Sequence, residues 1–452
     1  MSEVTDTYLQ ASSYIADTAQ DQMTLQTAAG LTPHGLVSHP VFFSGTLTRP
    51  DVAAAGLRTL VEVASTRYFN PVPGGLASLD PVVTANGDRL RCEAFSACNG
   101  VYARLDLLGQ TFDGATLGFG TTNIDINPPL ARALAGVRAK HPLHLSVGPA
   151  QIQMTMPQGS FVERKVHLPE RWVRALAETQ SIAPTLRPRA SMDTVNWLRF
   201  INALPMSGGS GAGVNMWLQP TPTGLRQASK PAAGGVSLAG TARLSAIKRL
   251  QHLVQRVQVH GPDLDAGSLV AVSAWEFFLP GARLMLMLSP QPYRGFSGEG
   301  AVLSALTQAS GEDAATVSAL LAWEAAIDQA ALVKETGLSA ERVHRALQYL
   351  STSGHVGFDL HEQSYFHRQL PLVDARLNNN YPRLAAARAL VEAGAVTPEN
   401  AYLKVASGEH FHWVGFTNGA PRCTCEFWAK YAGSRGPCKH VLAAQLFLED
   451  KA

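Results

Sequence analysis

The sequence predicts an α+β chain built from several modules. Its 452 residues and 46% hydrophobic composition are enough to bury at least two cores. Helical and strand-like apolar patterns both recur along the chain. Three of the five cysteines lie within sixteen residues near the C-terminus, which marks a different kind of module there. These observations exclude a disordered chain and a secreted disulfide scaffold.

Residues 1–205 predict an α+β region with helices and an antiparallel meander. Pro50 opens a helix whose apolar residues recur at helical spacing. Asn86-Gly87 and Asn99-Gly100 then flank runs that alternate apolar and polar residues. Because Asn-Gly readily adopts the positive φ of a tight turn, we expect consecutive antiparallel strands.

The middle of the chain predicts a linker and a second folded segment. Residues 206–235 are rich in Gly, Pro, Ser and Thr without a sustained period, so we expect a long loop or linker. A second α+β segment is expected over residues 236–310. Residues 371–399 are expected to carry a connecting helix that leads to the last module, residues 400–452.

The charge balance restricts the kinds of partner. Lys plus Arg number 37 and Asp plus Glu number 35, a net charge of +2. No strong overall field therefore attracts nucleic acid, anionic lipid or acidic substrate, and such binding must be local. Residues 1–20 carry Asp6 and Asp17 and no continuous apolar run, so we expect no signal peptide or membrane span and a cytoplasmic protein.

Residues 311–370 predict three helices followed by two short strands. The first helix is expected to reach Trp323. The third begins after Ser339, a good N-cap, and places apolar residues at i, i+3, i+4 and i+7. Alternating runs then start at Val356 and Tyr365. This order resembles a winged helix-turn-helix.

A winged helix that reads DNA presents its third helix to a groove and its wing to phosphate. The residues that would face the groove are Arg342, His344, Arg345 and Gln348. His361 and Arg368 of the wing would lie near phosphate. Winged helices also serve as dimerisation and docking modules, and Arg342 and Arg345 can equally form a solvated face.

Four residues near the C-terminus have the spacing of a metal site: Cys423, Cys425, Cys438 and His440. Two cysteines one residue apart on a strand project from the same face, and the other pair lies at the start of an apolar-patterned helix. Three thiolates and one imidazole complete the closed tetrahedral shell of structural zinc, so we expect one Zn²⁺. The alternative is three reduced cysteines and a core histidine without metal. His410 and His412 are possible competing ligands.

Alternating runs around Lys404 and His412 predict a β-hairpin that feeds the first two ligands. This C-x-C, C-x-H pattern in a strand-strand-helix context resembles the SWIM zinc finger family over residues 400–452. The resemblance implies binding to DNA or protein. The contact residues expected within the finger are Lys404, Trp413, Arg422, Lys430, Arg435 and Lys439. Trp413 can equally be a core residue.

The layout of the whole chain, with a winged-helix-like segment before the finger, resembles the stand-alone bacterial SWIM proteins. Members of that group are typically encoded beside AAA-type ATPases and von Willebrand A-domain proteins. The resemblance therefore implies a protein-interaction adaptor with a partner of one of these two kinds. Nucleic acid is the alternative partner, and no membrane is expected.

The sequence carries no catalytic motif that identifies an enzyme. The glycine-rich residues 207–213 lack the Lys-Ser/Thr of a phosphate loop. The C-terminal third lacks the His-x-Glu of a zinc deaminase. The leading hypothesis is a non-enzymatic zinc-binding recognition protein. The alternatives are a DNA-binding protein and an enzyme with an unrecognised site in the N-terminal region.

Overall fold

The computed structural model describes most of the chain. The described residues are the strands β1 to β4 (Ser13–Ile15, Gln22–Thr24, Gly30–Thr32 and Gly35–Val37) and residues 41–68, 81–124, 126–166, 168–204, 215–298, 300–308, 310–370, 381–417, 420–433 and 435–449. Among these residues, no helix combines the length and the apolar character that crossing a bilayer requires.

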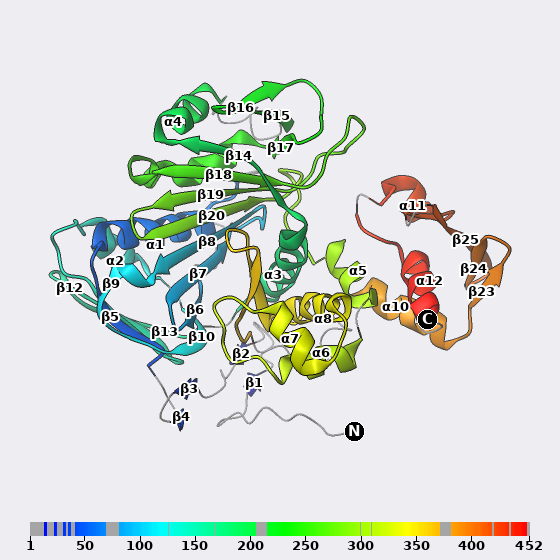
Figure 1. The fold of residues 1–452 in the computed structure, drawn as a ribbon, viewed down its shortest axis with the longest axis horizontal. Coiled ribbons are helices and arrows are strands. Elements are labelled where there is room, and N and C mark those ends of the chain that lie inside the picture. The colour runs from blue at the N-terminus through cyan, green and yellow to red at the C-terminus, as the bar shows by residue number, and fades with distance from the viewer. Residues whose placement is uncertain are drawn as a thin grey trace.

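An antiparallel sheet of eight strands forms the centre of the molecule (Figure 1). In order across the sheet they are β10 (Phe119–Asn123), β6 (Val82–Asn86), β7 (Arg89–Phe95), β8 (Val101–Leu108), β20 (Ala282–Leu288), β19 (Ser273–Leu279), β18 (Arg256–Gly261) and β14 (Arg187–Asp193). Two runs of three consecutive strands meet where β8 pairs with β20. Gly87 and Asn99, with φ of 82° and 52°, lie in the two turns of the first run.

One face of this sheet is apolar and packs against helix α1 (Pro50–Ser65). Leu105 on β8 lies opposite Leu284 on β20, and both are fully buried. A Cβ added at Gly56 of α1 would lie 2.8 Å from Leu105 Cδ1, so the helix sits directly on the strand. Helix α2 (Pro128–Ala135) packs in turn against α1.

Two smaller sheets flank the large one. The first runs β13 (Gly159–Arg164), β12 (Gln151–Met156), β11 (His144–Val147), β5 (Phe43–Leu47) and β9 (Phe112–Leu117). The second runs β16 (Gly224–Ala228), β15 (Asn215–Thr221) and β17 (Val236–Ala239). Helices α3 (Glu170–Ile182) and α4 (Thr194–Ala203) precede it.

The expectation of a long loop over residues 206–235 is wrong for residues 215–228. Residues 215–228 form the β15–β16 hairpin, while residues 206–214 lie outside the described residues. Only Leu218 of β15 is buried, so this strand has too little apolar alternation to be recognised in the sequence.

Residues 311–370, here called the winged-helix-like segment, contain three helices and a hairpin. They are α6 (Gly311–Ser318), α7 (Gln329–Thr336), α8 (Ala340–Thr352), β21 (Val356–Asp359) and β22 (Ser364–His367). The first helix ends at Ser318, so the expectation that it reaches Trp323 is wrong. Trp323 has a φ of 66° and stacks on His367, which takes it out of any helix.

The β21–β22 hairpin covers the second face of the large sheet, which carries charged side chains. The buried ion cluster between them consists of Arg91, Arg104, Asp106, Arg283 and Asp359, with side chains at most 4% exposed. Asp359 lies 2.8 Å from Arg91, 2.9 Å from Arg283 and 3.3 Å from Arg104. Asp359 of the hairpin and Asp106 of β8 therefore compensate guanidinium groups from three strands of the sheet together.

Burial opposes ionisation of Asp359, but the guanidinium groups of Arg104, Arg91 and Arg283 outweigh it and hold the pKa of Asp359 well below its usual value. Nearby, Arg368 pairs with Glu93 at 2.5 Å, and both side chains are buried. The winged-helix-like segment is thus attached to the body of the molecule through charge compensation.

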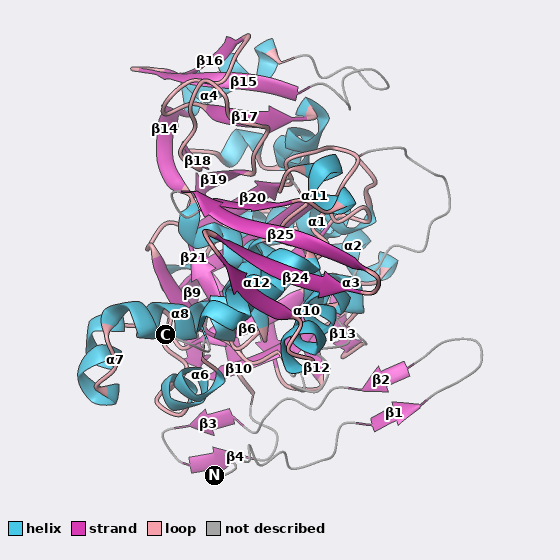
Figure 2. Ribbon diagram, turned by 90° about the vertical axis from the view of Figure 1, so that its right-hand side faces the viewer, coloured by secondary structure: helices cyan, strands magenta, loops and turns pink. Residues whose placement is uncertain are grey.

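The C-terminal module lies at one end of the molecule (Figure 1). Its elements are α10 (Pro382–Glu392), β23 (Val396–Glu399), β24 (Tyr402–Ser407), β25 (His410–Thr417), β26 (Ala420–Cys423), α11 (Glu426–Tyr431) and α12 (Lys439–Glu449). The four strands pair in chain order, and α12 packs between this sheet and helix α5 (Ala301–Gln308) of the body. Figure 2 shows the sheet in front, with its outer side turned away from the body.

We expect Asp359→Ala to lower the free energy of unfolding by about 3–5 kcal/mol, because it leaves buried guanidinium groups uncompensated. Urea denaturation measures this change. The matched control is Arg249→Ala, which removes a 2.7 Å pair with Glu62 whose side chains are 40% and 44% exposed. That control should change the stability by less than about 1 kcal/mol. Equal effects of the two substitutions would contradict the role given to Asp359.

The free energy of unfolding should also decrease as the pH decreases, because protonation of His367 is disfavoured in the folded protein. Burial, with a smaller contribution from His355, lowers the pKa of His367 from 6.5 to about 3. Because the folded pKa lies below the unfolded one, the contribution is complete above pH 6.5 and is lost by about 1.4 kcal/mol per unit as pH falls toward 3. In calorimetry from pH 7 to 4, His367→Gln should therefore show a shallower decline of Tm than the unaltered chain. His410→Gln, at an exposed position, should leave the decline unchanged.

Candidate metal centre

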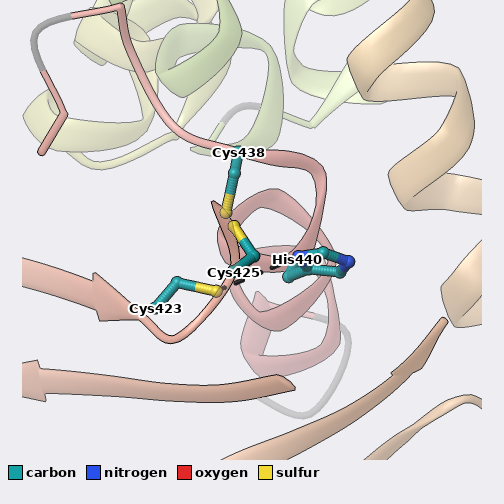
Figure 3. Close-up of side chains that lie close together, drawn as sticks. All are labelled: Cys423, Cys425, Cys438 and His440. Atoms are coloured by element: carbon teal, nitrogen blue, oxygen red, sulfur yellow. Dashed lines mark hydrogen bonds between the residues drawn. The ribbon is translucent and has the colours of Figure 1, made fainter. Parts of the chain in front are cut away.

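Four potential ligands converge where the last strand and the last helix of the C-terminal module meet. Cys423 ends β26, Cys425 is the N-cap of α11, and Cys438 and His440 lie at the start of α12. All four are buried, and their ligand atoms lie within 4.8 Å of one another. Figure 3 shows the three sulfur atoms pointing into one small space beside the His440 ring.

Local hydrogen bonds orient the cysteines. The Trp428 N–H donates to Cys425 Sγ at 3.4 Å, and the Val441 N–H donates to Cys438 Sγ at 3.5 Å. Backbone N–H groups at a helix start stabilise a thiolate, as they do any anion. Both helices therefore prepare their cysteine for metal binding.

The donor set fits zinc. Cys423 Sγ lies 3.9 Å from His440 Nδ1. Zinc–sulfur bonds are about 2.3 Å and zinc–nitrogen bonds about 2.0 Å, so atoms already this close need only small movements to share one ion. Three sulfurs and one imidazole nitrogen are the soft ligands that zinc prefers, and four protein ligands make a closed, structural site.

Proton sharing among the thiols follows the same geometry. A hydrogen bond between Cys423 and Cys438 is the main cause that raises the pKa of Cys423 and lowers the pKa of Cys438. Burial raises the pKa of Cys425. The three thiols therefore titrate as one coupled group, and metal binding requires that they release their protons.

The loop between the two pairs of ligands is held from outside. Arg383 of α10 donates from Nη1 to the carbonyl oxygens of Arg435 and Pro437, both at 2.9 Å. Gly436 has a φ of 75°, and a Cβ added there would lie 2.4 Å from the Cα of Gly300 in the body. A glycine at this position therefore lets the ligand loop contact the body directly.

His412 lies beside the ligands without joining them. Its ring packs against the His440 ring, with centroids 4.1 Å apart and planes tilted by 33°, and the ligand cluster among the described residues consists of the three cysteines and His440. His410 is exposed at the start of β25. The histidines that the sequence offered as competing ligands therefore take other positions.

The positions of the predicted contact residues in the finger fall into two groups. Lys404, Trp413 and Arg422 lie on the outer side of the sheet, since Lys404 pairs with Trp413 and Arg422 pairs with Gly415 in the β-ladder. Lys430 and Arg435 lie around the Tyr431 ring, at 5.4 and 4.8 Å from its centroid. Lys439, half-buried, opens α12. Trp413 is 36% exposed, so it is not a core residue.

The two arginines predicted to read DNA from the winged-helix-like segment form ion pairs with acidic residues of the same segment. Arg342 makes a bidentate pair with Asp313 at 2.6 and 2.8 Å, and Arg345 pairs with Glu341 at 2.7 Å. Gln348 is half-buried.

The two wing residues differ in their exposure to solvent. His361 is exposed, with its ring 5.1 Å from that of Phe278. Arg368 has no exposed side-chain surface and pairs with Glu93. The expectation that Arg368 lies near phosphate is wrong, because the wing is docked on the sheet.

The sequence analysis missed two exposed aromatic residues on the finger. Tyr402 is 55% exposed and Phe411 is 59% exposed. The signal that could have found them is the alternation itself, because Tyr402 lies two residues before Lys404, and Phe411 two residues before Trp413. Residues two apart on a strand share a face.

The closed set of three cysteines and one histidine defines a structural zinc finger. The finger is a SWIM zinc finger, because the family model of that description matches residues 412–446. It fits one structural Zn²⁺. No curated protein matches the chain.

Two solved structures are similar to part of the chain. The Proliferating Cellular Nuclear Antigen of Entamoeba histolytica is 12% identical with a TM-score of 0.36, and the match covers 56% of this chain and 100% of that one. The PCNA2–PCNA3 complex of Sulfolobus tokodaii is 12% identical with a TM-score of 0.39, over 55% of this chain and 99% of that one. At these TM-scores the likeness carries no argument about function.

We expect about one zinc per chain, and well under one in Cys423→Ser and His440→Ala, because each substitution opens the tetrahedral shell. Elemental analysis of purified protein measures the metal content. Hydrogen exchange should rise in residues 396–449 and stay unchanged in the large sheet, because zinc binding supplies the folding energy of the finger alone. Cys98→Ser, a cysteine outside the cluster, is the control and should keep its zinc.

Proposed function

We propose that this chain is a non-enzymatic recognition protein whose zinc finger presents one side of its sheet to a macromolecular partner. This side, called the outer face, consists of Tyr402, Lys404, Phe411, Trp413 and Arg422. The observation that carries the proposal is the exposure of three aromatic rings beside two cations on one rigid sheet. Aromatic residues and arginine are the side chains that most often dominate binding energy at interfaces.

The outer face is held in shape by its own contacts. The Lys404 ammonium lies 4.3 Å from the Phe411 ring centroid and 5.7 Å from that of Trp413. A Cβ added at Gly415 would lie 2.8 Å from Tyr402 Cδ1, so the Tyr402 ring covers the bare backbone of β25. The Trp413 N–H donates to Thr424 Oγ1 at 3.0 Å, which ties the strand to the residue between two ligands.

The surfaces that a winged helix uses for binding are already packed against other parts of this chain, which leaves the finger as the proposed recognition module. Helix α8 packs against α3, α5, α6 and α7, and the wing is buried through Asp359 and Arg368. We propose that the segment keeps the docking role of a winged helix and that its docking partner is the sheet of the same chain. DNA reading by Arg342 and Arg345 requires their release from Asp313 and Glu341, so it is the less favoured function.

The identity of the partner stays a prediction. An AAA-type ATPase or a von Willebrand A-domain protein is implied by the resemblance to stand-alone SWIM proteins, and a cytoplasmic location goes with it. An enzymatic site in the N-terminal region also stays an untested alternative.

The test places a photocrosslinking amino acid at Phe411 in living cells. We expect covalent adducts of higher mass from this position, because the outer face is the contact surface. Adducts are identified by their sensitivity to protease or nuclease and by mass spectrometry. The matched control is Phe416, an equally suitable aromatic position, 36% exposed, on the opposite side of the same strand. Equal adduct yields from both positions would contradict the proposal.

A further inference from the structure

We infer that the outer face takes a single-stranded nucleic acid, whose bases stack on Phe411, Trp413 and Tyr402 while its phosphates meet Lys404 and Arg422. This inference rests on the proposed function and names the partner class for the same surface. Stacking platforms of this kind join exposed aromatic rings to nearby cations, and they accept any base because each base has a π-face.

The aromatic rings are arranged along and across two paired strands. Phe411 and Trp413 lie on the same side of β25, about 6.8 Å apart along the strand. Tyr402 lies on β24, against Gly415 and thus beyond Trp413 on the same side. The three rings therefore form a continuous track along the outer face, on which successive bases find a ring each.

The cations lie on this track. Lys404 of β24 lies directly opposite Trp413 of β25 in the ladder. Arg422 of β26, the neighbour of β25 along its other edge, lies opposite Gly415 and on the same face of the sheet. Glu399 of β23 also faces the outer side, 3.7 Å from the Lys404 ammonium, and Glu409 is exposed in the turn that precedes β25. Lys404 and Arg422 nevertheless place two cations directly beside the rings, where they can meet phosphate, while the chain as a whole stays near neutral.

The character of the remaining outward positions favours a nucleic acid over a protein. Between the rings, Ala406 pairs with Phe411, and Gly415 carries no side chain. These small residues add no bulk beside the rings, so Phe411 and Tyr402 keep 59% and 55% of their surface exposed, with the Lys404 ammonium over the Phe411 ring. A protein interface is formed by interdigitating side chains, whereas exposed rings with small neighbours and a nearby cation suit the faces of bases and their phosphates.

A single strand is favoured over a duplex for the same reason. In a duplex the base faces are already stacked, and a protein reaches them only by unstacking, which costs a few kcal/mol per step. Duplex binding without base contacts depends on many phosphate contacts, and the outer face offers two cations. The platform therefore has most to gain from bases that are already unstacked.

The metal centre supports this platform from behind. β25 turns Phe411 and Trp413 outward, while His412 and Val414 between and beside them face inward. The His412 ring packs against the His440 ring, and Val414 pairs with Cys423 in the β-ladder. One strand thus joins the zinc ligands to the stacking surface, so nucleic-acid binding should require bound zinc.

The test uses the full-length, zinc-loaded chain and a fluorescein-labelled oligothymidine of about fifteen nucleotides, a length within the usual site sizes of such platforms. Fluorescence anisotropy measures the affinity. We expect Phe411→Ala and Trp413→Ala each to weaken binding roughly 5- to 150-fold, the loss of one stacked base. Phe411→Trp should restore it. Phe416→Ala is the matched control and should leave the affinity unchanged, with zinc content verified for every variant.

Two further measurements separate stacking from simple charge attraction. An abasic strand of the same length keeps the phosphates and removes the bases, so it should bind at least about tenfold more weakly than oligothymidine. The slope of log affinity against log salt should be about −1.4 for two phosphate contacts, and Lys404→Gln or Arg422→Gln should each reduce it by about 0.7.

Three outcomes overturn the inference: equal affinity for the abasic and base-containing strands, unchanged affinity in Phe411→Ala and Trp413→Ala, or no oligonucleotide binding by the zinc-loaded chain. If photocrosslinks at Phe411 then go to a protein, the outer face remains the recognition surface and only the nucleic-acid assignment fails. If Phe411 and Phe416 crosslink alike, the proposed function fails as well.

Discussion

The C-terminal module depends on four ligand atoms sharing one ion. The zinc finger within it, residues 400–452, has about fifty residues, so its hydrophobic core is small and metal coordination adds stabilisation. Cys423 ends the sheet and Cys425 follows it as the N-cap of α11, whereas Cys438 and His440 lie at the start of α12. The ion therefore joins the two layers of the finger. β25 lies against this site on one side and solvent on the other, so the metal also determines the shape of the surface that we propose for recognition.

A second constraint, compensation of buried charge, decides the role of the winged-helix-like segment. The large sheet presents arginines on one face, and a dry face of that kind requires an opposing carboxylate at close range. Asp359 supplies it from the hairpin, and Glu93 in the sheet receives Arg368 in return. The segment is consequently part of the body, and Arg368 serves the fold.

These two constraints give the chain two structural parts, the body and the finger. The body, with the docked segment, presents the finger at one end, while the sheet of the finger turns outward (Figures 1 and 2). The contacts at the junction are specific: Arg383 holds the ligand loop from α10, and Gly436 packs against Gly300. The surface that we propose for recognition is thereby kept clear of the rest of the molecule.

The sequence by itself determined the metal centre. The spacing of Cys423, Cys425, Cys438 and His440 is local, and strand and helix periodicity then dictate where each side chain points. Helices that begin at Pro50 and Ser339 were predictable for the same reason, since caps and apolar periods act over a few residues. The mixed α+β character of the chain followed from these patterns.

Only the tertiary structure decided which faces are covered. In the sequence, the arginines of the first meander alternate with apolar residues just as a solvated strand face does. The structure buries that face, because a carboxylate more than 250 residues away meets it. The same holds for the finger, where Phe411 and Trp413 could point inward or outward until α12 packed against the other side. Alternation states which residues share a face, and only long-range packing states which face meets water.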